Sequence, residues 1–493
     1  MIKSLFNNEI SMTHAHRPSS SRRQGLFSLL QVYLITLVIG TIRALPLILC
    51  FRLGEILGLL VYVSIAYYRK LVDQNLSIAF GENFSQRERA RIARHYFRLL
   101  GANMLSAIKI PTLSTIRLRE ILTIEDEMSF KNFLDGSCAP GVVVAISHFG
   151  NWEMNAQLAN LLRERRAGAI YQRLRNKALD DLINADRSQG VMTFDRKRDL
   201  PAAVNFLREG GLLGVLIDQH AGDSGIWMPF FHKLASTSPL AATLAKKTGA
   251  MLIHATIHTI GPARWILRLN PPTPTEDRTV AQITYDLNCQ LAQKIQESPQ
   301  EWFWVHNRWK LPFPAFLLAR VKRGIYLPKE ETALQPLKLL VRSPNWLGDA
   351  CMAAPAICSL KKGRPDLHLT ILTPQKLTAL WKSFDEVDEV IEIPPKASPW
   401  LVARKLKKSN RRQGQPPFEA ALVLPNSIRS ALEVRLANIP RCIGRTEKKG
   451  VVRQWLIHQP FPKFACTHQA DEYHAVAHWL GTTIPPCKEE QRA

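Results

Sequence analysis

The fold of the larger part of the chain is decided by the stretch GVVVAISHFGNWE (141–153). Its apolar run 141–147 predicts a buried strand, and a helix is predicted after it over 151–166. Two further apolar runs, GLLGVLID (211–218) and MLIHATIH (251–258), predict buried strands that are separated from the first by helices. Strands that alternate with helices are typical of an α/β domain with a mainly parallel sheet.

His148 directly follows the strand predicted over 141–147. Catalytic groups of open α/β sheets lie at the carboxyl ends of strands. Glu153 falls in the first turns of the next helix, so its carboxylate could turn back and fix one imidazole nitrogen, leaving the other to accept a proton. This is what an acyl transfer needs when a hydroxyl attacks a thioester directly. The alternative is a structural histidine, because the H-x-x-x-x-E spacing is common.

Motifs for other chemistries are missing from the sequence. The segment GDSGI (222–226) departs from the G-x-S-x-G nucleophile motif at its last position. Walker A, G-x-G-x-x-G and H-E-x-x-H motifs are absent, so no cofactor is expected. His254 and His258 would share one strand face, but no carboxylate or cysteine lies near them in sequence. We therefore favour core or surface positions over a metal site. Eight cysteines without a C-x-x-C motif favour a reducing compartment.

The formal charge is strongly positive, 65 − 41 = +24. It favours anionic partners: nucleic acid, anionic lipid, phosphorylated substrates or an acidic carrier protein. No RNP-like motif supports a nucleic-acid partner. The run from Arg404 to Arg412 holds six basic residues and no acid, and a solvated helix face is favoured over a specific binding patch there.

The N-terminal region contains an uncharged apolar segment, LFSLLQVYLITLVIGTI (26–42). An uncleaved membrane anchor is favoured over a buried core helix. The segment reaches the short end of the length that spans a bilayer, and no small-residue cleavage site follows it, which argues against a removed signal peptide. A second apolar stretch, 44–68, is interrupted by Pro46, Arg52 and Glu55 and is expected to form an interfacial hairpin. Basic residues on both sides fix the orientation only weakly.

A second α/β pattern begins after a junction at 312–336. Predicted strands are KLLVR (338–342), HLTILT (368–373), EVIEI (389–393) and AALVL (420–424), with helices over 349–361, 377–382 and 427–437. This is the pattern of a doubly wound, Rossmann-like unit.

The sequence resembles the lipid A biosynthesis lauroyl/myristoyl acyltransferases of the lysophospholipid acyltransferase-like superfamily. The likeness rests on ISHFGNWE (146–153), on YQRLRNKALDDLI (171–183), on residues 210–250 and on PQEWFWVHNRWK (299–310), and covers roughly residues 20–320. It implies His148 as the base and Glu153 as its supporting acid. The substrate-binding residues that it implies are Asn151, Arg173, Arg187, Asp218 and Gln219. Arg175 is as well explained by a surface position, and Asp218 could equally be a structural acid.

The stretch LLVRSPNWLGDACMAAPAICSLKKGRPDLHLTIL (339–372) is similar to the opening of the lipopolysaccharide heptosyltransferases, glycosyltransferase family nine. The resemblance continues through 422–445. It implies Asp349 as a general base, with Asn426 and Ser427 in an acceptor loop. From residue 338, 493 − 337 = 156 residues remain, which is room for one lobe. We therefore expect a truncated N-terminal lobe of GT-B type without a donor site.

Five regions are predicted: a flexible basic N-terminus (1–24), membrane or interfacial helices (25–68), an acyltransferase domain (69–320), a linker (321–337) and the glycosyltransferase-like lobe (338–493). The resemblances imply transfer of a fatty acyl chain from acyl carrier protein, or acyl-CoA, to a hydroxyl of a lipid A precursor or lysolipid. An anionic membrane is the expected partner surface, with the catalytic domain on the cytoplasmic side of the inner membrane and no nucleic acid involved. The alternative is a heptosyltransferase-type glycosyltransferase anchored by residues 1–330.

Overall fold

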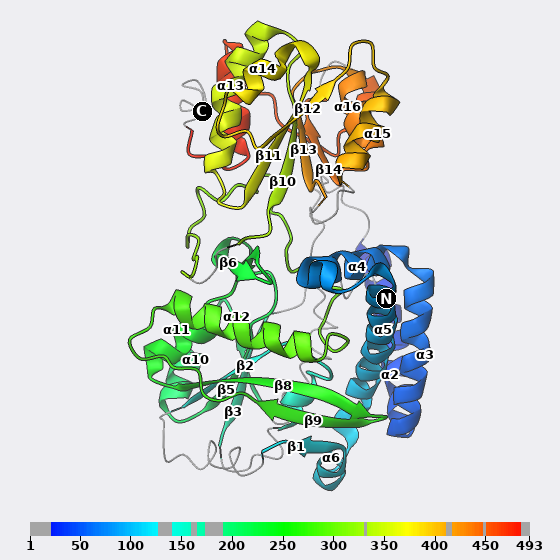
Figure 1. Ribbon diagram of the computed structural model, residues 1–493. Helices are drawn as coiled ribbons and strands as arrows, with labels where there is room; N and C mark the ends of the chain where they lie inside the picture. The colour runs from blue at the N-terminus through cyan, green and yellow to red at the C-terminus, as the bar shows by residue number, and fades with distance from the viewer. Residues whose placement is uncertain are drawn as a thin grey trace.

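The structure is a computed structural model that describes residues 21–126, 141–158, 165–172, 191–329, 333–410, 417–446 and 450–484, with the side chains of the first helix described from residue 33. It contains two α/β domains, one above the other in Figure 1, joined by an extended segment. The expected basic N-terminus up to residue 20 lies outside the described residues, and the first helix already begins at Ser21.

The first domain is built on a seven-stranded sheet of order β1-β9-β8-β2-β5-β3-β4. Every neighbouring pair is parallel except β8 and β9. The strands are β1 (Leu122–Ile124), β2 (Val142–Ile146), β3 (Ala167–Tyr171), β4 (Met192–Asp195), β5 (Leu212–Leu216), β8 (Met251–Gly261) and β9 (Arg264–Leu269). A separate antiparallel hairpin, β6 (Ile226–Phe230) with β7 (Lys233–Thr237), was not expected from the sequence.

Both faces of β2 are buried, which explains its continuous apolar run. Val143 and Ala145 pack against α10 (Leu200–Arg208), α11 (Leu240–Thr248) and α12 (Val280–Glu297). Val142 and Val144 belong to the opposite cluster, with α5 (Gln86–Lys109), α6 (Thr115–Ile121) and α8 (Met154–Leu158). The sheet is therefore the middle layer of three, and β2 lies at its centre.

Three long helices, α2 (Ser21–Ala44), α3 (Leu47–Ser64) and α5, lie side by side at one flank of this domain, and α4 (Ala66–Phe80) crosses their end (Figure 1). Gly54 of α3 faces Gly101 of α5 so closely that a Cβ on either residue would overlap the other's backbone. Within the described residues, α3 is the helix long and apolar enough, by length and composition, to cross a membrane, and only 22% of it is buried. The sequence had instead favoured residues 26–42 as the membrane-spanning segment.

The outer surface of α2 and α3 is apolar. Its exposed large side chains are Tyr33, Leu34, Leu37, Val38, Ile48, Leu49, Leu53, Ile56, Leu57, Leu60 and Val63. A contiguous exposed apolar surface of this size is typical of a contact with another protein or with a membrane.

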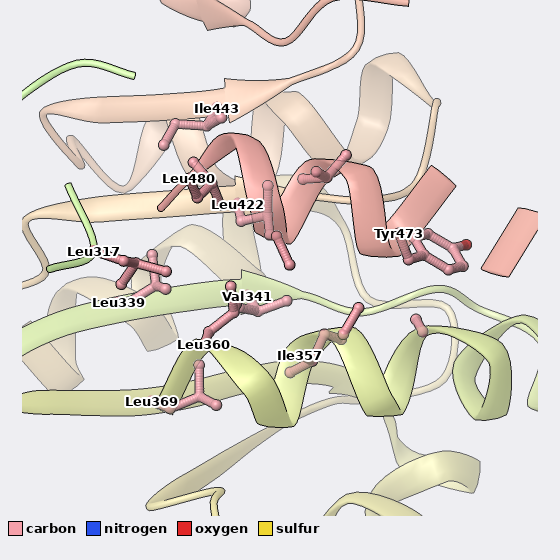
Figure 2. Packing of buried hydrophobic residues seen from close by; sticks show 14 of the residues in the cluster. Leu317, Leu339, Val341, Ile357, Leu360, Leu369, Leu422, Ile443, Tyr473 and Leu480 are labelled. Atoms are coloured by element: carbon pink, nitrogen blue, oxygen red, sulfur yellow. The ribbon is translucent and has the colours of Figure 1, made fainter. Parts of the chain in front are cut away.

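The second domain has a six-stranded, wholly parallel sheet of order β12-β11-β10-β13-β14-β15. Its strands are β10 (Leu337–Arg342), β11 (Leu367–Pro374), β12 (Glu389–Ile393), β13 (Ala420–Val423), β14 (Arg441–Gly444) and β15 (Gln459–Pro460). One face is covered by α13 (Leu347–Lys362), α14 (Thr378–Lys382) and α18 (Gln469–Trp479), and the other by α15 (Pro399–Asn410), α16 (Ile428–Leu436) and α17 (Gly450–Leu456). Figure 2 shows Leu339 and Val341 of β10 between Leu360 of α13 and Leu480 after α18.

The two domains are joined by buried polar contacts as well as by the chain. Lys233 of β7 donates to Glu419 beside β13 at 2.6 Å, and both side chains are largely buried. Leu317 lies in the core of the second domain (Figure 2), and the backbone N–H of Leu318 donates to Gly363 O at 2.7 Å. Arg441 donates to the carbonyl oxygens of Leu311 and Pro312. The segment before the expected linker is thus part of the second domain's packing.

Replacing Lys233 with Met should destabilise the junction, because the Glu419 carboxylate loses its ammonium partner in a buried site. We expect the free energy of unfolding to fall by about 3 kcal/mol, and the double variant Lys233→Met/Glu419→Gln to recover most of that loss. Chemical denaturation of the purified protein in detergent measures both. Equal stability of wild type and Lys233→Met would show that the ion pair does not hold the junction.

Candidate active site

His148 and Asp218 form the centre of the site. The two residues follow β2 and β5, which are parallel neighbours, so their carboxyl ends meet at the same edge of the sheet. His148 Nδ1 lies 2.7 Å from Asp218 Oδ1, and the backbone N–H of His148 donates to Asp218 Oδ2 at 2.7 Å. The carboxylate therefore fixes both the position of the histidine backbone and the orientation of its ring.

Asp218 is kept ionised by its surroundings. Burial raises its pKa, but the charge and hydrogen bonds of His148 and the indole N–H of Trp302, 2.9 Å from Oδ2, outweigh burial and lower the pKa to about 2. An ionised carboxylate only accepts hydrogen bonds, so His148 Nδ1 must carry the proton. Nε2 is then the nitrogen with the free lone pair.

The other side of the imidazole meets Gln219 and two aromatic rings. Gln219 Nε2 lies 3.3 Å from His148 Nε2, a long hydrogen bond that the amide donates. Trp152 packs edge-on to the ring at 5.0 Å between centroids, and Phe303 stacks at 5.6 Å. His148 is 7% exposed. Within the described residues no serine or cysteine bonds to this imidazole.

The segment 299–309 closes the site, a function that the sequence did not reveal. Phe303 N–H donates to His148 O at 3.0 Å, and Gly150 N–H donates to Glu301 O at 2.9 Å. Arg308, fully buried, donates to Ser236 O and Thr237 Oγ1 and so ties the segment to β7. Its signals in the sequence were the density of aromatic side chains in EWFWVHNRW (301–309) and the family resemblance over 299–310.

The histidines around the pair are neutral. Burial lowers the pKa of His254 to about 4 and that of His306 to about 3, although Asp218 acts in the opposite direction on both. Burial likewise lowers the pKa of His258 to about 3. His254 and His258 are core residues of β8, bonded to Ser147 and Thr256. Near these histidines, Asp218 carries a negative charge and the Arg308 guanidinium a positive one, although burial lowers the pKa of Arg308 to about 10.

Glu153 was expected to orient the imidazole, but Asp218 makes the contact with Nδ1. The expected helix start at Asn151 is also wrong, because α8 begins at Met154 and residues 151–153 form a turn. Glu153, half-buried, therefore lies in that turn rather than in a helix. The sequence could not show that a residue 70 positions away would reach the ring first.

Asn151 is fully buried directly after the His148 loop, and neither polar atom of its side chain has a hydrogen-bond partner among the described residues. An amide left unpaired in this way costs free energy unless a ligand or water satisfies it. Its expected place in substrate binding is compatible with this position. Arg173, Arg175 and Arg187 lie outside the described residues.

The second domain brings its predicted residues to one sheet edge. The order of β10 and β13 creates a topological switch point there, the usual ligand site of doubly wound sheets. Asp349 lies half-buried in the first turn of α13. Asn426 and Ser427 follow β13; the Ser427 side chain accepts from Ser430 N–H and caps α16, which gives it a structural function. The buried Arg342 bonds Glu433 and Asn345 and fixes the loop after β10.

The first domain is thus an α/β sheet that presents, at its carboxyl edge, a histidine held by an aspartate. The family model described as bacterial lipid A biosynthesis acyltransferase matches residues 21–311. The chain belongs to this family. It is 24% identical to the lipid A biosynthesis lauroyltransferase of Escherichia coli over 280 residues, 55% of this chain and 89% of that protein.

The second domain has different relatives. Over 149 residues, 29% of this chain, it is 31% identical to lipopolysaccharide heptosyltransferase 2 of Salmonella typhimurium and 30% identical to that of Escherichia coli. The chain spans 41% of the length of each. Among solved structures, ADP-heptose LPS heptosyltransferase II of E. coli is similar at 25% identity and a TM-score of 0.26, over 30% of this chain and 42% of that one.

Glu301 makes stability depend on pH. Burial raises its pKa to about 7, although the hydrogen bonds from Thr259 act in the opposite direction. The folded protein therefore holds a proton that the unfolded chain releases near pH 4.5, and stability falls as pH rises from there to about 7. The loss is on the order of 3 kcal/mol.

Glu301→Gln should remove this dependence and stabilise the protein at pH 8, because the amide keeps the contacts to Thr259 without a charge. Denaturation midpoints of both proteins at pH 5 and pH 8 measure it. An unchanged difference between the two pH values in Glu301→Gln would contradict the assignment.

Proposed function

We propose that this protein transfers a fatty acyl chain from acyl carrier protein, or acyl-CoA, to a hydroxyl of a lipid A precursor or related lysolipid. One observation carries the proposal. In this member of the family, the ionised Asp218 holds Nδ1 of the His148 imidazole, and Nε2 of that ring faces the weakly bonded amide of Gln219. That is the arrangement of a general base. The family supplies the acyl-transfer class and a lipid A-type acceptor.

The reaction needs no covalent enzyme intermediate. The acceptor hydroxyl displaces the Gln219 amide and donates to His148 Nε2. As its oxygen attacks the thioester carbonyl, the proton passes to Nε2, and Asp218 stabilises the imidazolium. The tetrahedral oxyanion then collapses, the C–S bond breaks, and the leaving thiolate takes the proton from Nε2. Both the neutral base and the acidic imidazolium are used in one turnover.

Four further side chains are assigned to substrate. The unpaired amide of Asn151 can donate to a substrate oxygen, and the oxyanion requires such a donor. Gln219, once displaced from His148, remains beside the reacting oxygen. Arg173 and Arg187 are proposed to bind phosphate groups of the acceptor, because the guanidinium fork matches phosphate. Glu153 lies in the turn before α8, next to the site. We propose that it supports the site from there and is not the partner of His148 Nδ1.

The substrates suggest where the protein works. We propose that α2 and α3 attach the domain to the cytoplasmic side of the inner membrane through their exposed apolar surface, with α3 as the candidate span. A formal charge of +24 would speed encounter with an acidic carrier protein and with anionic lipid.

A second candidate is glycosyl transfer of the heptosyltransferase type, with Asp349 as base and Asn426 and Ser427 at the acceptor. The 31% identity to a heptosyltransferase over 149 residues favours it. Supplying membranes with radiolabelled acyl donor and labelled nucleotide-heptose in separate reactions distinguishes the two, because each label enters lipid only through its own activity.

Replacing His148 with Ala should lower the acylation rate by about 10²–10⁴-fold, because the general base is lost. Asp349→Ala, in the other domain, is the matched control and should leave acylation unchanged. Transfer of labelled acyl chain from acyl carrier protein to lipid acceptor measures both. Full activity of His148→Ala would refute the mechanism.

Asp218→Asn and Glu153→Gln separate the two acids. Asp218→Asn should cost about 10²-fold or more in kcat, because the amide no longer fixes the Nδ1–H tautomer or balances the imidazolium charge. Glu153→Gln should reduce the rate less. If Glu153→Gln were the more damaging substitution, the supporting acid would be Glu153 in the reacting complex.

A further inference from the structure

The solvent-facing side of α15 combines aromatic, aliphatic and basic side chains without an acid. Val402, Ala403 and Leu406 are buried against the sheet. Trp400 is 68% and Leu401 50% exposed. The exposed cations on the same helix are Arg404, Lys405, Lys407 and Lys408. Lys405 also donates to the backbone oxygen of Glu392 at 2.9 Å. An apolar first turn followed by exposed cations is typical of helices that lie in a membrane interface.

The neighbouring helices continue this composition. α15, α16 and α17 share one core cluster on the same side of the sheet, and Figure 1 shows α15 beside α16. Ile428 begins α16, and α17 presents Val451, Val452 and Trp455, the last 72% exposed. Arg435 of α16 lies over the Trp455 ring at 5.6 Å. The one acid in these helices, Glu433, is fully buried and paired with Arg342.

Most of these apolar residues lie at one edge of the domain. α15, α16 and α17 each follow a parallel strand, so their first turns, which carry Trp400, Leu401, Ile428, Val451 and Val452, lie at the carboxyl edge of the sheet. Trp455, in the last turn of α17, extends this surface along the helix. The first turn of α13 adds Trp346, 70% exposed and covered by Lys376 at 4.6 Å, and Leu347. This is also the edge that carries Asp349 and Asn426. We name Trp346, Leu347, Trp400, Leu401, Ile428, Val451, Val452 and Trp455 the carboxyl-edge surface.

We propose that the carboxyl-edge surface, together with the cations of α15, is a second membrane-docking site, which places the second domain against an anionic bilayer independently of α2 and α3. Tryptophan prefers the headgroup region, and each nearby Lys or Arg gains from the negative surface potential. A lipid-linked acceptor would then reach the switch point directly from the bilayer.

The chemistry of the surface favours a bilayer over a soluble acidic partner. Cations alone are enough to bind nucleic acid or an acidic protein. A partner of that kind does not explain the eight exposed large apolar side chains near the cations. Insertion of those side chains removes apolar area from water, which contributes about 25 cal/mol per Å². Binding should therefore need both the cations and the apolar residues.

Hydrogen–deuterium exchange of the full-length protein in nanodiscs tests the proposal locally, because α2 and α3 are present in every sample. In discs of phosphatidylglycerol and phosphatidylethanolamine, the peptides spanning 398–410 and 450–457 should exchange several-fold more slowly than in discs of phosphatidylcholine alone. Identical exchange in both discs would overturn the proposal. Slow exchange produced in phosphatidylcholine discs by added acyl carrier protein or RNA would assign the surface to that partner and would overturn it too.

Two variant pairs separate charge from general damage. Lys407→Glu/Lys408→Glu should abolish the slowing at 398–410 in anionic discs. Lys362→Glu/Lys382→Glu makes the same charge change in the last turns of α13 and α14, on the opposite face of the sheet, and should retain it. Trp400→Ser/Trp455→Ser should also abolish it. Retained slowing in both the charge-reversal and the tryptophan variants would refute the role of this face.

Discussion

The buried hydrogen bond between Asp218 and His148 is the contact on which the first site depends. It forms because β2 and β5 are adjacent and parallel, so two residues distant in sequence leave the sheet at one edge. The carboxylate accepts three hydrogen bonds, from the His148 backbone, its ring and the Trp302 indole, and this overcomes the cost of burying a charge. The aromatic segment 299–309 is thus part of the site, since the Trp302 indole N–H helps to keep Asp218 ionised beside His148 Nδ1.

Much of the framework was predictable from local patterns. Strands buried on both faces are continuous apolar runs, so β2, β5, β8, β10 and β11 were found within a few residues. The hairpin β6–β7, with Pro229 and Lys233 in its strands, and the turn at 151–153 were not predicted. In those places turn geometry and tertiary packing decide, and periodicity carries little information.

The site shows the same division. His148 was found from its place after a strand, which is a local property. Its supporting acid was assigned to the nearest carboxylate in sequence, whereas strand adjacency gives that contact to Asp218, a residue that only the family resemblance had singled out. Trp302 and Phe303 reach the site on the loop that follows α12, where they bond to Asp218 and to the backbone of His148. No spacing rule connects them with His148. Proximity across a sheet is a property of topology, which short motifs do not encode.

In the mechanism that we propose, the long bond between Gln219 and His148 keeps Nε2 accessible to the acceptor. A lone pair without any partner would be costly on His148, which is 7% exposed, and a short charge-assisted bond would compete with substrate. At 3.3 Å the neutral amide satisfies Nε2 only weakly. An acceptor hydroxyl can replace it at little cost, and the amide that it displaces stays next to the reacting oxygen. Asp218 on the other nitrogen, at 2.7 Å, is the contact that does not exchange, so the ring keeps its orientation while its partner on Nε2 changes.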